Sequence, residues 1–215
     1  MSVDIECYSA LISKTGRPVL ASPELFEQSI EEHLRVIQAL RRELPALKQI
    51  ADRMSRAVLE NHKIVWCGNG GSAADSQHLA AEFVGRFLKE RRAIASIALT
   101  TNTSVLTALG NDYGYEHVFR RQVEAICMPG DVLVGISTSG NSKNVCYALE
   151  AAREIGVFTV AFTGANGGAM ARIADVTLSV PSSETPRIQE GQILCGHMIC
   201  NYVEDRFCEA QASSE

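Results

Sequence analysis

Short apolar segments alternate with segments of helical spacing from Lys63 onward, and this alternation limits the possible folds more than any other feature. The apolar segments are rich in valine, isoleucine and alanine, which is typical of strands in a parallel sheet covered on both faces. The sequence therefore predicts an α/β fold: a doubly wound, five-stranded parallel sheet with right-handed crossovers. The predicted strands are 63–67, 94–99, 131–137, 158–163 and 175–180, and the predicted helices are 72–88, 116–127, 141–155, 167–173 and 187–208.

Two further helical patterns precede the first strand. Ser22-Pro23 is typical of a helix start, because serine caps free N–H groups and proline fits the first turn. Apolar residues then recur at helical spacing, and Pro45 interrupts the pattern before it resumes. We predict an extension at 1–21, helices at about 23–43 and 46–61 for core and oligomer packing (22–61 as a whole), and a functional domain at 62–210 that forms one unit with these helices.

Size and composition exclude several classes of protein. The 215 residues suit one large α/β domain, and a net charge of −5 argues against binding to nucleic acid or to a membrane surface. The one dense basic run, 86–92, is interpreted as a solvated helix end. Seven cysteines without a C-x-x-C pair and the lack of a targeting or membrane-spanning segment indicate a reduced, cytoplasmic protein.

The segment CGNGGSAADSQHLAAEFVGR, residues 67–86, follows the first predicted strand. A strand, a glycine turn and a helix start form an anion site, because free backbone N–H groups and the positive end of the helix dipole face the ligand. His78 and Glu82 stand four residues apart on this helix, so both project from one face. The segment therefore combines a phosphate site with candidates for acid–base chemistry.

A second polar loop follows the third predicted strand. Residues 137–142, STSGNS, bring four hydroxyl groups, a glycine and a helix start together, which suits the oxygens of a phosphate monoester. One such loop is commonly only a capping turn. Two loops at equivalent positions of one parallel sheet favour a phosphate-bearing ligand at its carboxyl edge over two unrelated capping turns.

Nucleotide binding is the main competing interpretation of these loops. Gly68-x-Gly70-x-x-Ala73 satisfies the dinucleotide fingerprint, but the next predicted strand contains no Asp or Glu for a ribose. No Gly-Lys-Ser/Thr triplet follows the glycines, which excludes a P-loop.

The last predicted helix supplies further polar residues. Gln189 and His197 are eight positions apart, just over two turns, and can lean towards one region. A lone histidine in an apolar helix is more often structural. Together with His78 and Glu82, however, these residues form a set for a divalent metal, although an amide is a rare zinc ligand. Without a metal, Glu82 and His197 still make an acid–base pair.

Five motifs resemble those of bacterial phosphoheptose isomerases, members of the sugar isomerase (SIS) fold family. They are CGNGGSAADSQH with AAEFVGRF, LGNDYGY at 109–115, GDVLVGISTSGNS at 130–142, TGANGG at 163–168, and RIQE at 187–190 with the later His197. The resemblance implies a flavodoxin-like SIS fold and conversion of sedoheptulose 7-phosphate to D-glycero-D-manno-heptose 7-phosphate through an enediol, for lipopolysaccharide and other surface polysaccharides. It also implies cytoplasmic homotetramers with sites shared between subunits, and one zinc ion per subunit.

The same resemblance assigns roles to residues. Glu82 is implied as the general base and His197 as its acid–base partner. The implied zinc ligands are His78, Glu82, Gln189 and His197; the implied substrate-binding residues are Ser72, Ser137, Thr138, Ser139 and Ser142 for the phosphate, with Asn69, Gly70, Asp112 and Gln189 for the sugar. Two positions depart from members that have His and Asp where this chain has Gln192 and Pro186, and we expect altered sugar contacts there.

Two other functions remain open at this point. Some SIS proteins are non-catalytic regulators that bind a replication initiator, but these generally lack the Glu and His pair that is present here as Glu82 and His197. A sugar-phosphate sensor within a larger assembly is disfavoured because no second domain is predicted.

Overall fold

The structure is a computed structural model that describes residues 22–213. The predicted extension at 1–21 lies outside the described residues. Five parallel strands form one sheet in the order β2-β1-β3-β4-β5. The strand order reverses between β1 and β3, so a crevice for ligands is expected at their carboxyl ends. The strands are β1 (Ile64–Gly68), β2 (Ser96–Ala98), β3 (Val132–Ile136), β4 (Phe158–Gly164) and β5 (Val176–Val180), which confirms the predicted sheet.

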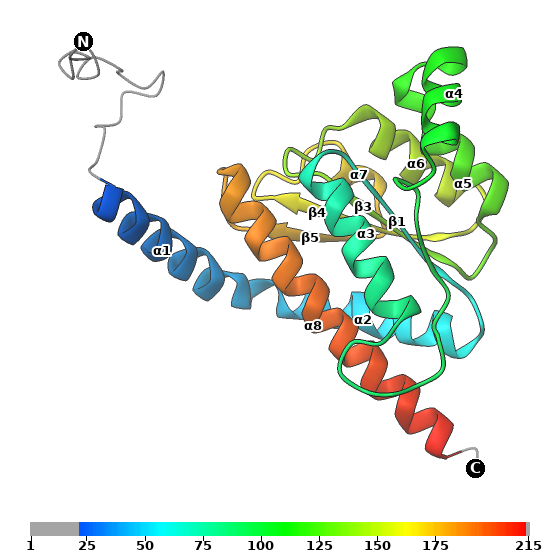
Figure 1. Ribbon diagram of the computed structural model, residues 1–215, viewed down its shortest axis with the longest axis horizontal. Coiled ribbons are helices and arrows are strands. Elements are labelled where there is room, and N and C mark those ends of the chain that lie inside the picture. Colours follow the sequence, from blue (N-terminus) through cyan, green and yellow to red (C-terminus); the bar gives the residue numbers. More distant parts are fainter. Residues whose placement is uncertain (1–21, 214–215) are drawn as a thin grey trace, which may run out of the picture.

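Two apolar clusters cover the two faces of this sheet, because successive strand residues point to opposite sides. Trp66 faces one cluster, which contains residues of α2 (Leu44–Leu59), α3 (Gly71–Val84) and α8 (Thr185–Ala212). Cys67 faces the other, with residues of α5 (Arg120–Ile126), α6 (Lys143–Glu154) and α7 (Met170–Ile173). Figure 1 shows the resulting three-layer arrangement, with α3 and α8 side by side.

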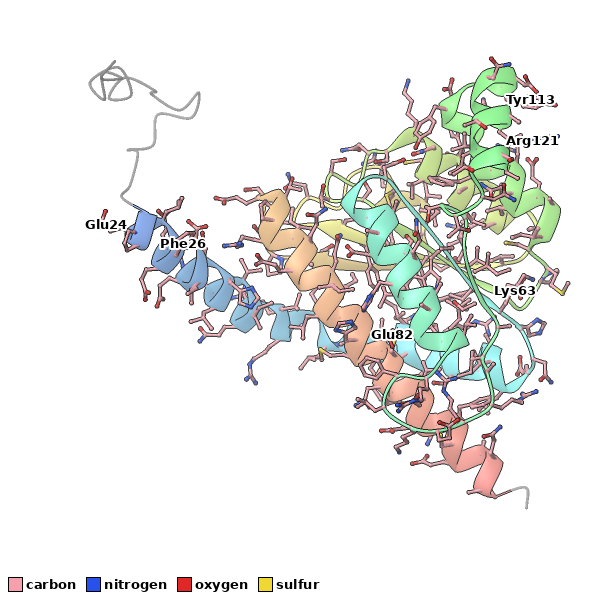
Figure 2. The ribbon with its side chains drawn as sticks, viewed as in Figure 1. Glu24, Phe26, Lys63, Glu82, Tyr113 and Arg121 are labelled. Atoms are coloured by element: carbon pink, nitrogen blue, oxygen red, sulfur yellow. The ribbon has the colours of Figure 1, made fainter. Side chains whose placement is uncertain are left out.

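The N-terminal helices are continuous and divide between core and surface. α1 (Ser22–Ala39) passes through a 3-10 turn, η2 (Leu40–Glu43), into α2, and Pro45 lies in the first turn of α2, where its missing N–H is not needed. Most apolar residues of α2 are buried. The apolar residues in the first half of α1 point outward: Phe26 is 67% exposed, and Figure 2 shows it near the projecting end of α1. The apolar stripe of α1 is therefore open to contact with another chain.

One helix was not predicted from the sequence. α4 (Thr103–Tyr113) follows β2 and begins at Asn102, whose side chain accepts a hydrogen bond from the Val105 N–H group (3.1 Å). None of its residues is fully buried, and only Leu106 and Leu109 pack partly against the core, so its apolar pattern is weak. A short 3-10 turn, η3 (Tyr115–His117), then leads to α5, which begins later than predicted.

The interpretation of the basic run as a solvated helix end is wrong for Arg91. α3 ends at Val84, and the run lies in the following loop. The Arg91 side chain is 1% exposed and pairs with Glu204 of α8.

The cysteines within the described residues are free thiols in mostly buried positions. Burial raises the pKa of Cys195 and of Cys200 to about 12, and that of Cys127 to about 11. These thiols are therefore protonated at neutral pH and are poor nucleophiles. Within residues 22–213, no helix is both long and apolar enough to cross a bilayer.

Candidate active site

The first predicted phosphate loop joins β1 to α3 in a very tight turn. A Cβ atom on Gly68 would lie 2.7 Å from the carbonyl oxygen of Ser72, so only glycine fits at this position. Gly70 has a φ of +57°, which glycine adopts without strain. The Ser72 N–H group donates to the carbonyl of Asn69 (3.0 Å), and the Ser72 side chain is buried at the start of α3. The turn thus aims the start of α3 at the carboxyl edge of the sheet.

The second loop brings three serine hydroxyls together at the neighbouring strand. Ser137 Oγ lies 2.9 Å from Ser142 Oγ and 3.4 Å from Ser139 Oγ. The same loop contains Thr138, which was also predicted to bind the phosphate. Its carbonyl accepts a hydrogen bond from the Gly164 N–H group (3.1 Å), which fixes the loop. Because α6 begins at Lys143, directly after these hydroxyls, its N-terminal N–H groups add to the anion site.

An amide pair locks the two loops to each other. Asn69 Nδ2 donates to Asn144 Oδ1 (2.9 Å), and Asn144 Nδ2 donates to Asn69 Oδ1 (2.8 Å). The Tyr115 hydroxyl also donates to Asn69 Oδ1 (3.3 Å). In this structure Asn69, predicted to bind the sugar, therefore holds the second loop in place. Asn144 was missed because nothing in the sequence shows which polar residue it faces.

The acid–base candidates meet where α3 and α8 lie side by side. A Cβ atom on Gly196 would lie 2.6 Å from the side chain of Leu79, so this glycine lets the two helices approach closely. The adjacent His197 then reaches His78, with 2.8 Å between the two Nε2 atoms. Glu82 Oε1 lies 3.4 Å from His78 Nε2, and Figure 2 shows Glu82 on α3 beside α8. The structure thus brings together three of the four predicted metal ligands, including both predicted catalytic residues.

Asp75 joins this cluster and was not singled out from the sequence. It precedes His78 by three positions, which places both on one face of α3. Burial raises the pKa of its half-buried carboxyl group, while positive charge on His78 or His197 opposes that rise. Its position three residues before His78 was the sequence signal that could have identified Asp75 as a site residue.

Two predicted substrate residues lie away from the histidines. The Gln189 amide lies against Gly71: its Nε2 atom is 2.3 Å from where a Cβ on that glycine would be. Gln189 is thus beside the first loop, about 12 Å along α8 from His197. Asp112 is exposed on α4, where it accepts a hydrogen bond from Asn111 Nδ2 (2.8 Å). Among the described residues of one chain, neither contacts the acid–base cluster.

The donor atoms of the cluster suit a divalent metal by type. Two imidazole nitrogens and a carboxylate oxygen are standard zinc ligands, with metal–ligand distances near 2.0–2.2 Å. Tetrahedral geometry would separate two such nitrogens by about 3.3 Å, whereas the two Nε2 atoms are 2.8 Å apart. Within residues 22–213, no group of three or more His, Cys, Asp or Glu side chains already has metal-binding geometry. The residues fit zinc once the two rings separate slightly.

Gln192, one of the departures expected to alter sugar contacts, is instead in the interior. Its side chain is 1% exposed, and neither of its amide atoms has a hydrogen-bond partner. Pro186 is exposed in the first turn of α8.

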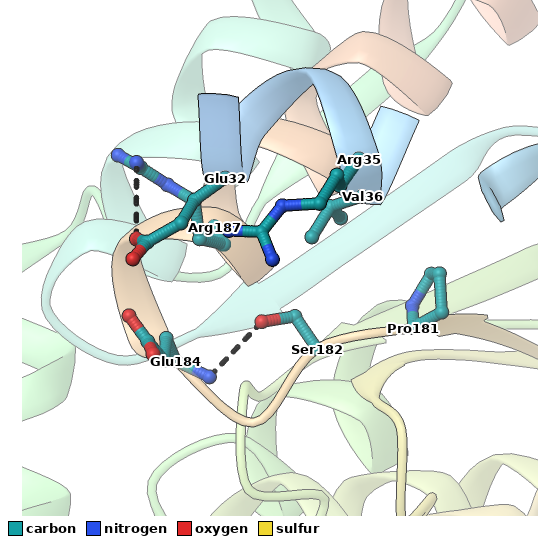
Figure 3. A pocket seen from close by; sticks show the side chains of 7 residues that line it. All are labelled: Glu32, Arg35, Val36, Pro181, Ser182, Glu184 and Arg187. Atoms are coloured by element: carbon teal, nitrogen blue, oxygen red, sulfur yellow. Dashed lines mark hydrogen bonds and ion pairs between the residues drawn. The ribbon is translucent and has the colours of Figure 1, made fainter. Parts of the chain in front are cut away.

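A separate hollow of about 350 Å³ lies between α1 and the start of α8 (Figure 3). Arg187 of α8 reaches α1, because its guanidinium pairs with Glu32 at 3.9 Å and donates a hydrogen bond to the carbonyl of Ser29. The Glu184 N–H group donates to Ser182 Oγ (3.1 Å) where β5 leads into α8. These contacts anchor the end of α8 that carries Gln189.

Comparisons with known proteins show which family the chain resembles. A SIS domain family model matches residues 26–164. Phosphoheptose isomerase from Aquifex aeolicus is 53% identical over 186 residues, which cover 86% of this chain and 96% of that protein. Phosphoheptose isomerase from Rhodospirillum rubrum is 56% identical over 164 residues, covering 76% and 87%.

Solved structures give the same result. Phosphoheptose isomerase GmhA from Neisseria gonorrhoeae is 44% identical with a TM-score of 0.82, covering 86% of this chain and 100% of that one. The sugar isomerase domain of an RpiR transcription factor from Sphaerobacter thermophilus covers 86% and 93% with a TM-score of 0.63, and at 22% identity it shows the fold alone.

Proposed function

The chain belongs to the phosphoheptose isomerases of the SIS family, which are aldose–ketose isomerases, and on this premise we propose that it converts sedoheptulose 7-phosphate to D-glycero-D-manno-heptose 7-phosphate. One observation carries the proposal. The pair of Glu82 and His197 lies on α3 and α8, and α3 begins at the edge of the sheet where the serine loop can hold a phosphate.

We assign phosphate binding mainly to the second loop, with a smaller contribution from the first loop. The hydroxyls of Ser137, Ser139 and Ser142 converge in front of the N-terminus of α6. They donate hydrogen bonds to phosphate oxygens, while the dipole of the helix favours the negative charge. Thr138 and Ser72 complete this set, and Gly70, Asn69, Asp112 and Gln189 are proposed for the sugar side of the site.

The reaction requires a proton to leave C1 of the ketose and to return at C2. The Glu82 carboxylate accepts the C1 proton, which gives an enediol, and the resulting carboxylic acid returns a proton to C2. At the same time a proton passes from the C1 hydroxyl to the oxygen on C2, and His197 is placed to carry it. Because its Nε2 contacts His78 Nε2 at 2.8 Å, one of these nitrogens donates and the other accepts. The two rings therefore hold a proton between them that His197 can exchange.

Zinc is proposed at the same cluster, held by His78, Glu82 and His197, with Gln189 as the fourth ligand implied by the family resemblance. When bound, such a cation polarises the substrate carbonyl as a Lewis acid. A carboxylate that binds a metal is a weaker base, and an imidazole nitrogen that binds a metal cannot also hold a proton, so the metal-binding and proton-transfer roles of Glu82 and His197 are partial or sequential.

Metal content provides an independent test of this cluster. We expect elemental analysis after purification without chelators to find about one divalent ion per subunit. His78→Ala should lose that ion because it removes a central ligand, while His117→Ala, at a histidine that stacks on Tyr147 away from the cluster, should retain it. Equal metal content in both variants would contradict the proposed ligands.

We also propose that the protein is a cytoplasmic homotetramer with sites shared between subunits. The exposed stripe of α1, with Phe26, Ile30 and Leu34, supports assembly because apolar patches on stable proteins are usually covered. Light scattering should give a mass near four times 23.3 kDa, and a monomer would contradict the proposal. Cell fractionation tests the location.

Substrate specificity is tested with a panel of ketose phosphates that have seven, six and five carbons. The value of kcat/KM should be highest for sedoheptulose 7-phosphate, because a phosphate held at 137–142 fixes how far C1 and C2 reach towards Glu82. A higher value for a shorter ketose phosphate would keep the isomerase assignment but overturn the proposed substrate.

A further inference from the structure

A buried ion pair holds the loop that leaves the end of the catalytic helix. Arg91, in the loop after α3, places its Nε atom 3.0 Å from Glu204 Oε1 on α8, and both side chains are 1% exposed. Glu204 follows His197 by seven residues, about two turns along the same helix. The pair therefore connects the chain segments that carry the two proposed catalytic residues.

Glu204 organises the backbone of this loop. Its carboxylate accepts hydrogen bonds from the N–H groups of Phe87 (2.9 Å), Leu88 (2.7 Å) and Lys89 (2.8 Å). Burial opposes ionisation, but these N–H groups and the charge of Arg91 outweigh it and lower the pKa of Glu204. The carboxylate is therefore charged at neutral pH and fixes three consecutive loop residues.

Arg91 in turn closes the C-terminal end of α3. Its Nη2 atom donates to the carbonyl of Glu82 (2.8 Å), and its Nη1 atom donates to those of Phe83 (2.9 Å) and Gly85 (3.2 Å). Carbonyl groups in the last turn of a helix lack partners within the helix. Arg91 supplies partners at the residue that bears the proposed base, and so restrains the backbone position of Glu82.

The same loop contacts the other catalytic residue. Phe87, whose N–H group binds Glu204, packs its ring on the imidazole of His197 with 5.6 Å between ring centroids. One anchored loop therefore contacts both proposed catalytic residues. The Arg91 side chain binds the backbone carbonyl of Glu82, and the Phe87 ring packs on the imidazole of His197.

We propose that Arg91 and Glu204 are positioning residues for the isomerisation, which hold Glu82 and His197 at the separation that proton transfer requires. A purely stabilising role explains the pair poorly, because removing two charges from water offsets most of their attraction. A buried ion pair whose hydrogen-bonding groups all have partners does, however, hold the two segments in a single geometry. The inference rests on the roles proposed above for Glu82 and His197.

The test compares this pair with a matched pair on the same two segments. Lys89 and Asp205 also join the loop to α8, at 2.7 Å, but are 51% and 42% exposed. Glu204→Gln keeps the shape of the side chain but loses the charge, and Arg91→Lys keeps the charge but cannot reach the three carbonyls. Each should lower kcat by about 10- to 100-fold, because small misplacements of reacting groups have effects of this size.

KM should change less than about threefold in these variants, because the phosphate loops are not altered, so the loss should fall on kcat and not on substrate binding. Lys89→Ala and Asp205→Asn should stay within about twofold of wild type, as exposed ion pairs contribute little. Rates are measured on protein shown to be folded by circular dichroism at the assay temperature.

Wild-type kcat in folded Glu204→Gln or Arg91→Lys would overturn the inference. So would equal losses in the control variants. If Glu204→Gln does not fold, Arg91→Lys and Phe87→Leu are compared with wild type instead. Phe87→Leu removes the ring contact with His197 and leaves the ion pair intact. Unchanged kcat in both variants overturns the inference. Undiminished turnover by Glu82→Gln would instead overturn the proposed function, so the two failures are distinguishable.

Discussion

Replacing Glu82 by glutamine should lower kcat for the isomerisation about 1,000-fold, with KM within a few-fold of wild type. A positioned general base contributes roughly 10²- to 10⁴-fold, and a neutral amide cannot accept the C1 proton. Binding should persist, because glutamine keeps the size of the side chain and the proposed phosphate site, with Ser137 and Ser142, lies elsewhere. The measurement is initial rates of aldoheptose phosphate formation at saturating and limiting substrate.

Glu90→Gln is the matched control for this substitution. Glu90 follows α3 in the loop that carries Arg91, and its side chain is 92% exposed, so the same change there should leave kcat unaltered. If Glu82→Gln turned over substrate at the wild-type rate, Glu82 would not be the base.

Gly140→Ala should disable phosphate binding and destabilise the fold. Gly140 has a φ of +66°, and a Cβ atom there would lie 2.1 Å from the carbonyl oxygen of Gly167. The neighbouring contacts also depend on this approach, because the Gly140 carbonyl accepts the Met170 N–H group (2.9 Å) and Asn141 Oδ1 accepts that of Ala169 (2.9 Å). The serine loop would have to move away from the loop that supports it.

We therefore expect KM to rise at least tenfold and the free energy of unfolding to fall by about 3 kcal/mol, more than backbone strain alone. Urea denaturation and steady-state kinetics measure the two effects. Gly156→Ala is the control: its φ is +77°, but a Cβ there would meet only Pro129 at 3.7 Å, an ordinary contact, so it should cost only backbone strain of about 1–3 kcal/mol and leave KM unchanged. Equal effects on KM at Gly156 and Gly140 would show that the close approach to Gly167 is unimportant.

Strands and helix faces, which follow a regular sequence period, were predicted well from the sequence. Apolar runs identified all five strands and placed a polar loop after β1 and another after β3, and the observed sheet order makes these two loops neighbours. Spacing within one helix placed His78 beside Glu82. α4 escaped prediction because only Leu106 and Leu109 pack partly against the core, too few for a clear apolar stripe, although Asn102 marked its start.

Features that depend on contacts between distant segments could not be predicted. Nothing in the sequence shows that Asn69 pairs with Asn144, or that Arg91 turns inward to Glu204 while Lys89 stays at the surface. The eight-residue spacing of Gln189 and His197 allowed them to lean together, but packing places Gln189 beside Gly71. Such pairings depend on how α8 lies across α3 rather than on a local pattern.

The central claim is that Glu82 and His197 isomerise sedoheptulose 7-phosphate by proton transfer, and NMR spectroscopy of the reaction in D₂O tests it most directly. Glu82 is 24% exposed and His78 is 47% exposed, so protons held by this cluster exchange with solvent. We predict that the wild-type protein forms D-glycero-D-manno-heptose 7-phosphate carrying solvent deuterium at C2. Failure to form the aldoheptose phosphate, or its formation with the original C1 hydrogen fully retained at C2, would contradict the account.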